Sequence, residues 1–236
     1  MPELTLERLL SKLGYGSRKE SRALVRMGLV TLGGKIAEDP FMILEPMPKT
    51  LQVNGEEIPV VTELYIMLHK PQGYECSHQP RHHDSVFGLL PERFLGMEIQ
   101  CVGRLDVETS GLLLLSNQGK FIHQVESPKK GLLKKYRAEL AREFTEAQKA
   151  QLLEGVALRN EKKKVQAKEI ETLGKKIITI SIQEGLYHQV RRMLAAAGNH
   201  VEQLSRLSIG NVALPETLAP GAWRYLTQEE IENLGG

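Results

Sequence analysis

The chain has 236 residues, 41% of them hydrophobic and 25% charged, and a formal net charge of +2 at pH 7. This is the composition of an ordinary globular protein, long enough for one large core and a small appended domain. Apolar runs such as Leu112–Leu115 are far shorter than the roughly 20 residues that cross a bilayer, which excludes a membrane-spanning class. The net charge is too small to imply a partner by itself.

The first predicted elements form a small N-terminal module. Leucines recur at helical spacing from Leu6 to Leu13. A second helix begins at Ser17, and Glu20 three residues later completes a capping box. A strand over 29–32 and a hairpin signal over 51–55 follow. Two helices and a hairpin-rich sheet are therefore expected over residues 1–58.

After a short linker at 59–63, strands and helices mix without steady alternation from 64 to 236. This order, with short turns between strand pairs, indicates an α+β fold with a mixed, mainly antiparallel sheet rather than a doubly wound fold. The expected strands cover 64–69, 99–102, 111–115, 134–141 and 177–182. The expected helices cover 120–126, 145–154, 188–197 and 227–234, with capping boxes at Thr145/Gln148 and Thr227/Glu230.

Positive charge is concentrated in two stretches. Residues 1–36 hold seven Lys or Arg against three acidic residues, and residues 127–142 hold six against one. Lys19, Arg22 and Arg26 follow helical spacing and predict a basic stripe on one helix face. Two separate basic patches suit a polyanion that spans more than one surface, although two solvated faces would give the same pattern.

The loop Gly103–Thr109 places a carboxylate beside a guanidinium at the start of an apolar strand. Carboxylates are ordinarily ionised at neutral pH, and a nearby arginine can orient one for attack or for proton abstraction. Asp106 is therefore the candidate catalytic residue. The local residues also fit a surface turn with an exposed Arg–Asp pair, which is common and contributes little energy.

Four motifs in order distinguish these alternatives. They are His69-Lys70-Pro71-Gln72-Gly73, Gly103-Arg104-Leu105-Asp106, Lys134-Lys135-Tyr136, and the run from Glu184 to Met193. Together they resemble the RsuA/RluA branch of the pseudouridine synthases. The N-terminal module, with its Gly14-Tyr15-Gly16-Ser17-Arg18 run, resembles the S4 RNA-binding domain.

The resemblance implies isomerisation of a uridine within RNA, without a cofactor. Asp106 would be the catalytic carboxylate, and Arg191 would form a bidentate salt bridge with it. Tyr136 would stack on the uracil or take part in proton transfer, although a strand tyrosine also fits core packing. Arg191 and Arg192 lie off the apolar stripe of their helix and could simply be solvated. The residues expected to contact RNA are Arg104, Lys134, Lys135, Arg18, Lys19, Arg22, Arg26 and Arg192.

Within the branch, the run from His188 to Met193 with the following Gly198–Val201 is most similar to the RsuA type, which acts on 16S ribosomal RNA. The expected partner is therefore 16S rRNA, free or in an assembling small-subunit particle, and the protein is expected to be a monomer. The alternatives are a 23S rRNA synthase of the same family and a non-catalytic RNA-binding assembly factor.

No metal site is expected. Cys76, His78, His82 and His83 lie close together, but their spacing fits no closed zinc pattern, and Cys101 is isolated in the sequence. No nucleophile elbow, phosphate-binding loop or zinc-protease motif is present. Two cysteines and the absence of a signal-peptide pattern predict a reduced, cytoplasmic setting.

Overall fold

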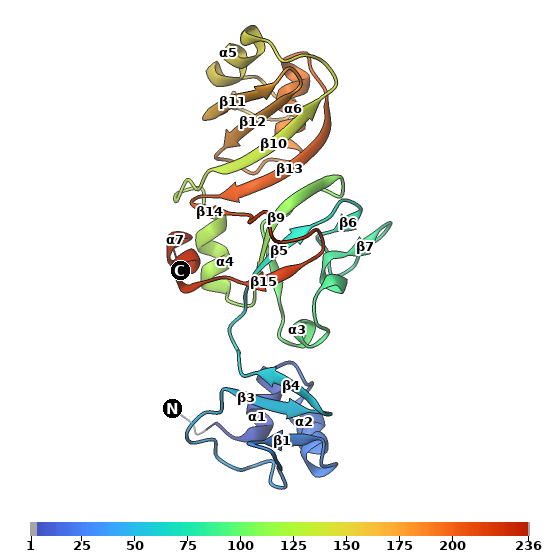
Figure 1. The fold of residues 1–236 in the computed structure, drawn as a ribbon. Coiled ribbons are helices and arrows are strands. Elements are labelled where there is room, and N and C mark those ends of the chain that lie inside the picture. The colour runs from blue at the N-terminus through green and yellow to red at the C-terminus, as the bar shows by residue number, and fades with distance from the viewer. Residues whose placement is uncertain (1–3, 236) are drawn as a thin grey trace. The chain divides into compact units, whose positions relative to one another are not determined.

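The computed structural model describes residues 4–235 (Figure 1). The chain divides into two compact units. Unit 1 comprises residues up to Leu64 together with Leu90–Gln100, and unit 2 comprises Tyr65–Leu89 together with the chain from Cys101 onward.

Unit 1 contains two helices and a four-stranded sheet of order β2-β1-β3-β4, in which the neighbouring strands are antiparallel. Both expected helices and the hairpin are confirmed. The elements are α1 (Leu6–Lys12), α2 (Arg18–Arg26), β1 (Val30–Leu32), β2 (Lys35–Ile36), β3 (Thr50–Val53) and β4 (Glu56–Pro59).

The leucines of α1 form the centre of this unit, because Leu6, Leu9 and Leu10 are fully buried. Helix α2 begins as expected at a Ser17/Glu20 capping box. Asn54 and Gly55 both have positive φ, 52° and 81°, which is the requirement of a two-residue hairpin turn.

A short segment of the sequence assigned to the second domain lies in unit 1. It contains α3 (Arg93–Gly96). Gly14 and Gly96 approach so closely that a Cβ on either would collide with backbone atoms of the facing segment. By its contacts Leu90–Gln100 therefore groups with unit 1, and glycines at both positions allow this close backbone approach. The expected boundaries of 1–58 and 64–236 stay predictions.

Unit 2 is built on a nine-stranded sheet with the path β11-β12-β10-β13-β9-β5-β15, to which β14 and β8 are attached. The β13–β9 pair is parallel, whereas β5–β9, β10–β12 and β10–β13 are antiparallel. The mixed, mainly antiparallel sheet is thus confirmed. Its strands are β5 (Tyr65–Lys70), β8 (Gln100–Val102), β9 (Thr109–Ser116), β10 (Lys134–Leu140), β11 (Glu169–Gly174), β12 (Ile177–Ile182), β13 (Val201–Ile209), β14 (Val212–Ala213) and β15 (Trp223–Tyr225).

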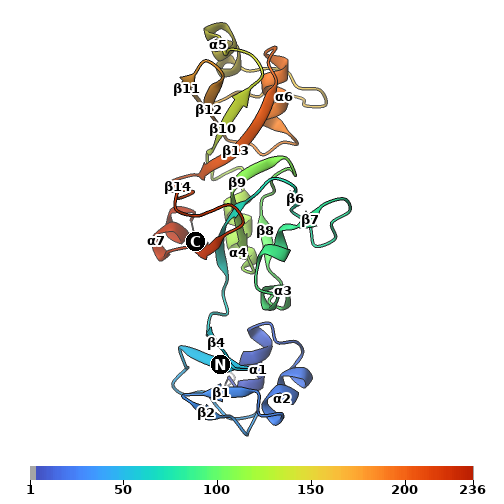
Figure 2. The ribbon, with the colours of Figure 1, turned by 45° about the vertical axis from the view of Figure 1, so that its right-hand side comes forward.

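The helices of unit 2 begin and end close to the expected residues, and both expected capping boxes are present. Strand β9 is buried along almost its whole length, and its alternate leucines Leu112 and Leu114 share a core cluster with Phe121 of α4. In Figure 2, β8 and β9 lie beside α4. The helices are α4 (Gly119–Glu126), α5 (Glu146–Glu154), α6 (Gln189–Ala196) and α7 (Gln228–Asn233), and the short elements β6 (Tyr74–Glu75), β7 (Asp84–Ser85) and η1 (Val86–Leu89) complete the unit.

Strand β13 was not expected from the sequence, although it is the longest strand and joins β10 to β9. Its pairing with β10 shifts register at two points. The buried positions Val201, Leu204, Arg206 and Ile209 are consequently spaced by three, two and three residues, and the alternation that marks a strand is lost.

In the described part of the chain, no helix has the length and apolar character needed to span a membrane.

Candidate active site

Asp106 lies in the loop between β8 and β9, as the sequence indicated. The chain turns at Gly103, whose φ is 72°, a conformation that glycine adopts without a steric penalty. The loop closes where the Thr109 N–H donates to the carbonyl oxygen of Asp106 at 3.0 Å. The Asp106 side chain is 36% exposed, so its carboxylate is available to a ligand.

A buried lysine holds the far side of this loop. Lys70, at the end of β5, is fully buried, and its Nζ donates to the carbonyl oxygens of Pro71, Val107 and Thr109 at 3.0, 3.2 and 2.8 Å. Burial lowers the pKa of Lys70, while the negative charge of Asp106 is among the influences that raise it. Lys70 therefore fixes the backbone beside Asp106 and contributes positive potential to the site.

Two further hydrogen bonds fix the loop. The Gly103 N–H donates to Oε1 of Glu126, at the end of α4, at 2.7 Å. The Gly73 N–H donates to the carbonyl oxygen of Val107 at 2.9 Å. The segment carrying Asp106 is thus anchored from β5, from α4 and from the turn after β5.

His188 is the side chain that meets the Asp106 carboxylate. Its Nε2 lies 3.3 Å from Oδ1 of Asp106, and the two side chains are similarly exposed. His188 stands at the N-cap of α6 with φ 47° and ψ 35°. A left-handed backbone at a residue other than glycine is uncommon and concentrates at functional sites.

Arg191 does not form the expected salt bridge with Asp106. Its guanidinium donates to the carbonyl oxygens of Val201 and Glu108, at 3.0 and 3.4 Å, and lies 3.9 Å from the Glu108 carboxylate. The Arg191 guanidinium is occupied by two backbone carbonyls, and the turn before α6 places His188 beside Asp106 instead. Arg191 instead joins α6 to the end of the loop that carries Asp106.

Tyr136 lies on β10 and is 8% exposed. Its cross-strand neighbour on β13 is Arg206, which is 2% exposed and donates from Nε to the Leu112 carbonyl oxygen at 2.8 Å. Arg206 in turn pairs with Gly111 on β9. Tyr136, Arg206 and Gly111 thus lie side by side on three neighbouring strands at the centre of the sheet. The positive charge of Arg206 is buried there, which the sequence did not reveal.

The neighbouring lysines have different surroundings. Lys134 is partly buried and donates to the Gln183 carbonyl oxygen at 3.1 Å, and burial followed by the charge of Arg206 lowers its pKa. Lys135 lies 3.7 Å from the Glu171 carboxylate and remains 39% exposed. Arg104 is exposed two residues before Asp106.

Arg192 is held by three partners within the chain. It lies 3.1 Å from Glu161 and donates to the carbonyl oxygens of Tyr187 and Arg159. Through these contacts Arg192 joins the loop at Arg159 to the turn at Tyr187. A contact of Arg192 with RNA stays a prediction.

The basic stripe of unit 1 lies on α2. Arg18, Lys19 and Arg26 are exposed. Arg22 is paired with Glu7 at 2.9 Å, and its guanidinium lies 5.8 Å from the centroid of the Phe41 ring. Three of the four cations are therefore available to a polyanion.

The two cysteines are brought together, although Cys101 is isolated in the sequence. The Cys101 thiol hydrogen-bonds Cys76 and, with help from the Leu105 backbone N–H and from Lys70, lowers the pKa of Cys76 to about 7 against the opposing effect of burial. The same pairing raises the pKa of Cys101. Both thiols are free, and Cys76 contacts the loop that carries Asp106.

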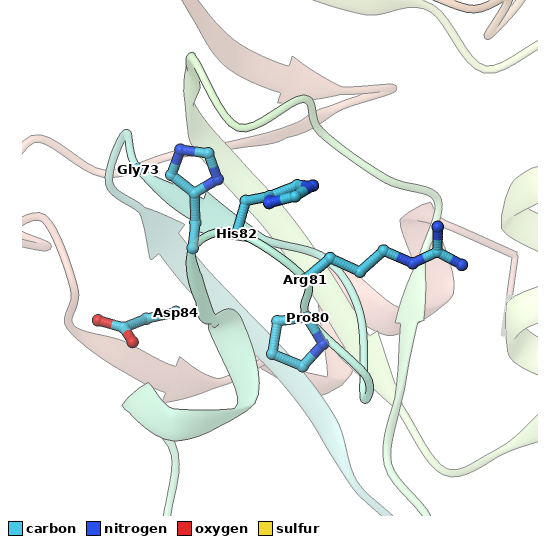
Figure 3. Close-up of a pocket in the computed structure, with 6 residues that line it drawn as sticks. Gly73, Pro80, Arg81, His82 and Asp84 are labelled. Atoms are coloured by element: carbon cyan, nitrogen blue, oxygen red, sulfur yellow. The ribbon is translucent and has the colours of Figure 1, made fainter.

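The histidine-rich segment after Cys76 forms a polar loop beside the site. It borders a pocket of about 420 Å³ lined by Gly73, Pro80, Arg81, His82, His83 and Asp84. Figure 3 shows the Arg81 and Asp84 side chains pointing in opposite directions from this loop. Among residues 4–235, no cluster of three or more His, Cys, Asp or Glu is placed to hold a metal ion.

Sequence reasoning missed four residues that shape the site. His188 and Lys70 stand inside motifs that were recognised, but only the fold shows that one meets Asp106 and the other supports its loop. Glu126 and Arg206 carried no sequence signal, because their partners, Gly103 and Leu112, are distant in the chain.

Comparison with known proteins agrees with this architecture. The model of the RNA pseudouridylate synthase family matches residues 64–196, and the S4 domain matches residues 5–47. An uncharacterized RNA pseudouridine synthase of Bacillus subtilis, YtzG, is 39% identical, with 98% of each chain covered. The ribosomal small subunit pseudouridine synthase A of Vibrio vulnificus is 38% identical, covering 98% of this chain and 99% of the relative.

A solved structure leads to the same family. A crystal structure of a pseudouridylate synthase is 34% identical, covers 98% of this chain and 99% of its own, and superposes with a TM-score of 0.69. The family match covers more than half of the chain, and the similarity to these relatives extends over nearly all of it. The chain therefore belongs to the RNA pseudouridylate synthase family and carries an S4 domain at its N-terminal end.

Proposed function

We propose that this enzyme converts one uridine of 16S ribosomal RNA to pseudouridine, with Asp106 as the catalytic carboxylate. The choice of 16S rRNA is supported by relatives named ribosomal small subunit pseudouridine synthase A, such as those of Vibrio vulnificus and Vibrio cholerae. The observation that carries the role of Asp106 is its position: a half-exposed carboxylate on a loop anchored by Lys70, Glu126 and Gly73.

The reaction breaks the bond between C1′ of the ribose and N1 of the uracil, and forms a bond between C1′ and C5. C5 then loses its proton and N1, released from C1′, takes one up, so the product is an isomer of the substrate and no redox partner is needed. Asp106 supplies a negative charge at the reacting nucleotide, as attacking group or as base. A rigid loop keeps this charge in place, which reduces the reorganisation needed in the transition state.

The other groups have roles that follow from their contacts. Nε2 of His188 lies close enough to the Asp106 carboxylate to orient it. Tyr136, mostly buried, is placed to pack against the uracil or to offer its hydroxyl for proton transfer, and its burial also fits the alternative of core packing. Lys134 and Lys135 contribute positive charge along β10 that would attract the phosphate backbone.

RNA binding extends to α2 in this proposal. Arg18, Lys19 and Arg26 are exposed there and would contact phosphates, with Arg22 held between them by Glu7. Such contacts give affinity that falls steeply with salt. A monomeric state, a cytoplasmic location and action on an assembling particle are predictions that accompany the proposal.

The experiment that tests the function measures tritium release from RNA containing 5-tritiated uridine. Free 16S rRNA, free 23S rRNA and partly assembled subunits serve as substrates for the wild type, Asp106→Asn and Asp84→Asn. Asp84 is an exposed carboxylate of the same unit and serves as the matched control. We expect release from 16S rRNA with the wild type and with Asp84→Asn, and none with Asp106→Asn.

The alternatives give different results. Release from 23S rRNA alone would transfer the assignment to the large-subunit synthases. Binding of rRNA without release from any substrate would identify a non-catalytic assembly factor and would remove the proposed role of Asp106.

A further inference from the structure

Tyr187 is the most exposed large side chain near the catalytic carboxylate. It is 71% exposed, yet its ring stacks on His188 with a centroid distance of 3.9 Å and an angle of 16° between the planes. His188 in turn contacts Asp106. One face of the Tyr187 ring is therefore covered by a residue of the site, and a large part of the ring is open to solvent.

The backbone around Tyr187 is fixed. Its carbonyl oxygen accepts a hydrogen bond from Nη1 of Arg192 at 3.1 Å. The preceding N–H, of Leu186, donates to Oε1 of Gln189 at 3.0 Å. An aromatic ring held in place in this way loses little conformational entropy when a ligand stacks on it.

Arg192 also brings a basic loop to this position. Its guanidinium pairs with Glu161 at 3.1 Å and donates to the carbonyl oxygen of Arg159. Glu161, the acidic residue of the 159–164 segment, is thereby occupied. The remaining cations of the segment are exposed: Arg159, Lys162, Lys163 and Lys164.

An exposed aromatic face beside several lysines is the combination that binds single-stranded nucleic acid. Every base has a π-face that can stack on an aromatic ring, and the cations neutralise the adjacent phosphates. We propose that Tyr187 stacks on an unpaired nucleobase next to the target uridine and that the 159–164 loop contacts the flanking phosphates. That the adjacent nucleotide is a target uridine rests on the proposed function. The stacking of a base on Tyr187 does not depend on it.

The first test measures binding of a 16S rRNA transcript to proteins that carry Asp106→Asn, so that no substrate is converted. Addition of Tyr187→Ala should raise Kd by about 5- to 100-fold, the range expected for loss of one base–aromatic stack. Tyr187→Phe keeps the ring and should stay close to the parent. Leu173→Ala removes another exposed apolar side chain of the same unit and serves as the control, with Kd expected to be unchanged.

A second measurement separates stacking from charge. Replacing Lys162, Lys163 and Lys164 together by Gln should reduce the slope of log Kd against log salt by up to about 2, since each phosphate contact on a single strand contributes about 0.7. The matched control replaces the exposed Lys168, Lys175 and Lys176 by Gln, which changes net charge equally and should leave the slope intact. Tyr187→Ala should lower affinity without changing the slope.

A uridine dodecamer with one central 2-aminopurine reports stacking directly and requires no particular target. Its fluorescence should be quenched by the parent and by Tyr187→Phe, and less by Tyr187→Ala. Equal quenching and equal Kd for all three proteins would overturn the proposal, as would an equal loss with Tyr187→Phe and Tyr187→Ala. If the parent sequence with Asp106 releases no tritium while Tyr187→Ala still weakens binding, the proposed function fails and the stacking site stands.

Discussion

Nε2 of His188 lies 3.3 Å from Oδ1 of Asp106, and His188 makes this contact from a left-handed backbone with φ 47°. Because this conformation is disfavoured for a residue with a Cβ, the surrounding structure must hold it. The contact limits the orientations of the carboxylate, which must be fixed if its charge is to act in the transition state.

We expect His188→Ala to lower kcat by about 10- to 100-fold, the equivalent of one polar contact with a charged group. His188→Gln retains an N–H donor at a similar reach and should recover part of the loss. His200→Ala removes an exposed histidine of the same unit and should leave kcat unchanged. Tritium release under single-turnover conditions measures the effect, and full activity in His188→Ala would rule out an orienting role.

Substitutions at His188 should change stability and activity independently of each other. The free energy of unfolding of His188→Gly should be about 1 kcal/mol higher than that of His188→Ala, because only glycine adopts this φ without a steric penalty. The glycine variant should therefore be the more stable of the two. Both variants lack the ring, so both should lose activity.

Lys70→Met should destabilise the protein by about 2 kcal/mol, since three carbonyl oxygens lose their donor while the cost of burying a charge is removed. Activity should fall as well, because the carbonyls of Val107 and Thr109 belong to the loop that carries Asp106. Urea unfolding and tritium release provide the two measurements. Lys168→Met, at an exposed site, is the control.

The pH dependence of Lys70 has a defined sign. Burial lowers its pKa from the ordinary value of 10.5, so the unfolded chain holds this proton more tightly than the folded protein. The free energy of unfolding of the wild type should therefore rise relative to Lys70→Met as pH increases from the lowered value to about 10.5. A constant difference over this range would contradict the assignment.

Much of the fold was predictable because its elements carry local signals. The three capping boxes, at Ser17, Thr145 and Thr227, mark helix starts that the structure confirms. The leucines of β9 and the β3–β4 hairpin signal were equally local. Strand β13 was not predicted, because its two register shifts break the alternation of buried and exposed residues on which strand prediction depends.

The position of the Asp106 loop between two strands was predictable, but the residues that contact it were not. The Gly103–Asp106 motif identified the loop, whereas the residues that hold it depend on long-range contacts. Glu126 reaches Gly103 from α4, and His188 reaches Asp106 from the turn before α6. The expected Asp106–Arg191 pair was wrong because a guanidinium can satisfy several acceptors, and only the fold shows which of them are within reach.

Glu75 should titrate far below an ordinary glutamate. The backbone N–H groups of His82 and Arg81, with a smaller effect from His83, lower its pKa from 4.5 to about 2. The interaction therefore stabilises the 77–84 loop above about pH 4.5 and is lost as pH falls through about 2. In NMR spectra recorded as a function of pH, the three amide signals should shift together with a midpoint near 2, and Glu75→Gln should abolish that step. A midpoint near 4.5 would show that these hydrogen bonds are not formed.

Cys76 should be the reactive thiol of the pair at neutral pH. Its pKa is lowered to about 7, chiefly by the hydrogen bond from Cys101, whereas the pKa of Cys101 is raised. The thiolate is the nucleophile, so iodoacetamide should alkylate Cys76 first, with a pH midpoint near 7. Cys101→Ala removes the donor, raises the pKa of Cys76 and should slow its alkylation at pH 7, while Cys101→Ser retains an O–H donor and should restore much of the rate. Site-resolved mass spectrometry measures both thiols, and faster labelling of Cys101, or identical rates in the Ala and Ser variants, would show that the two sulfur atoms are not coupled as the structure indicates.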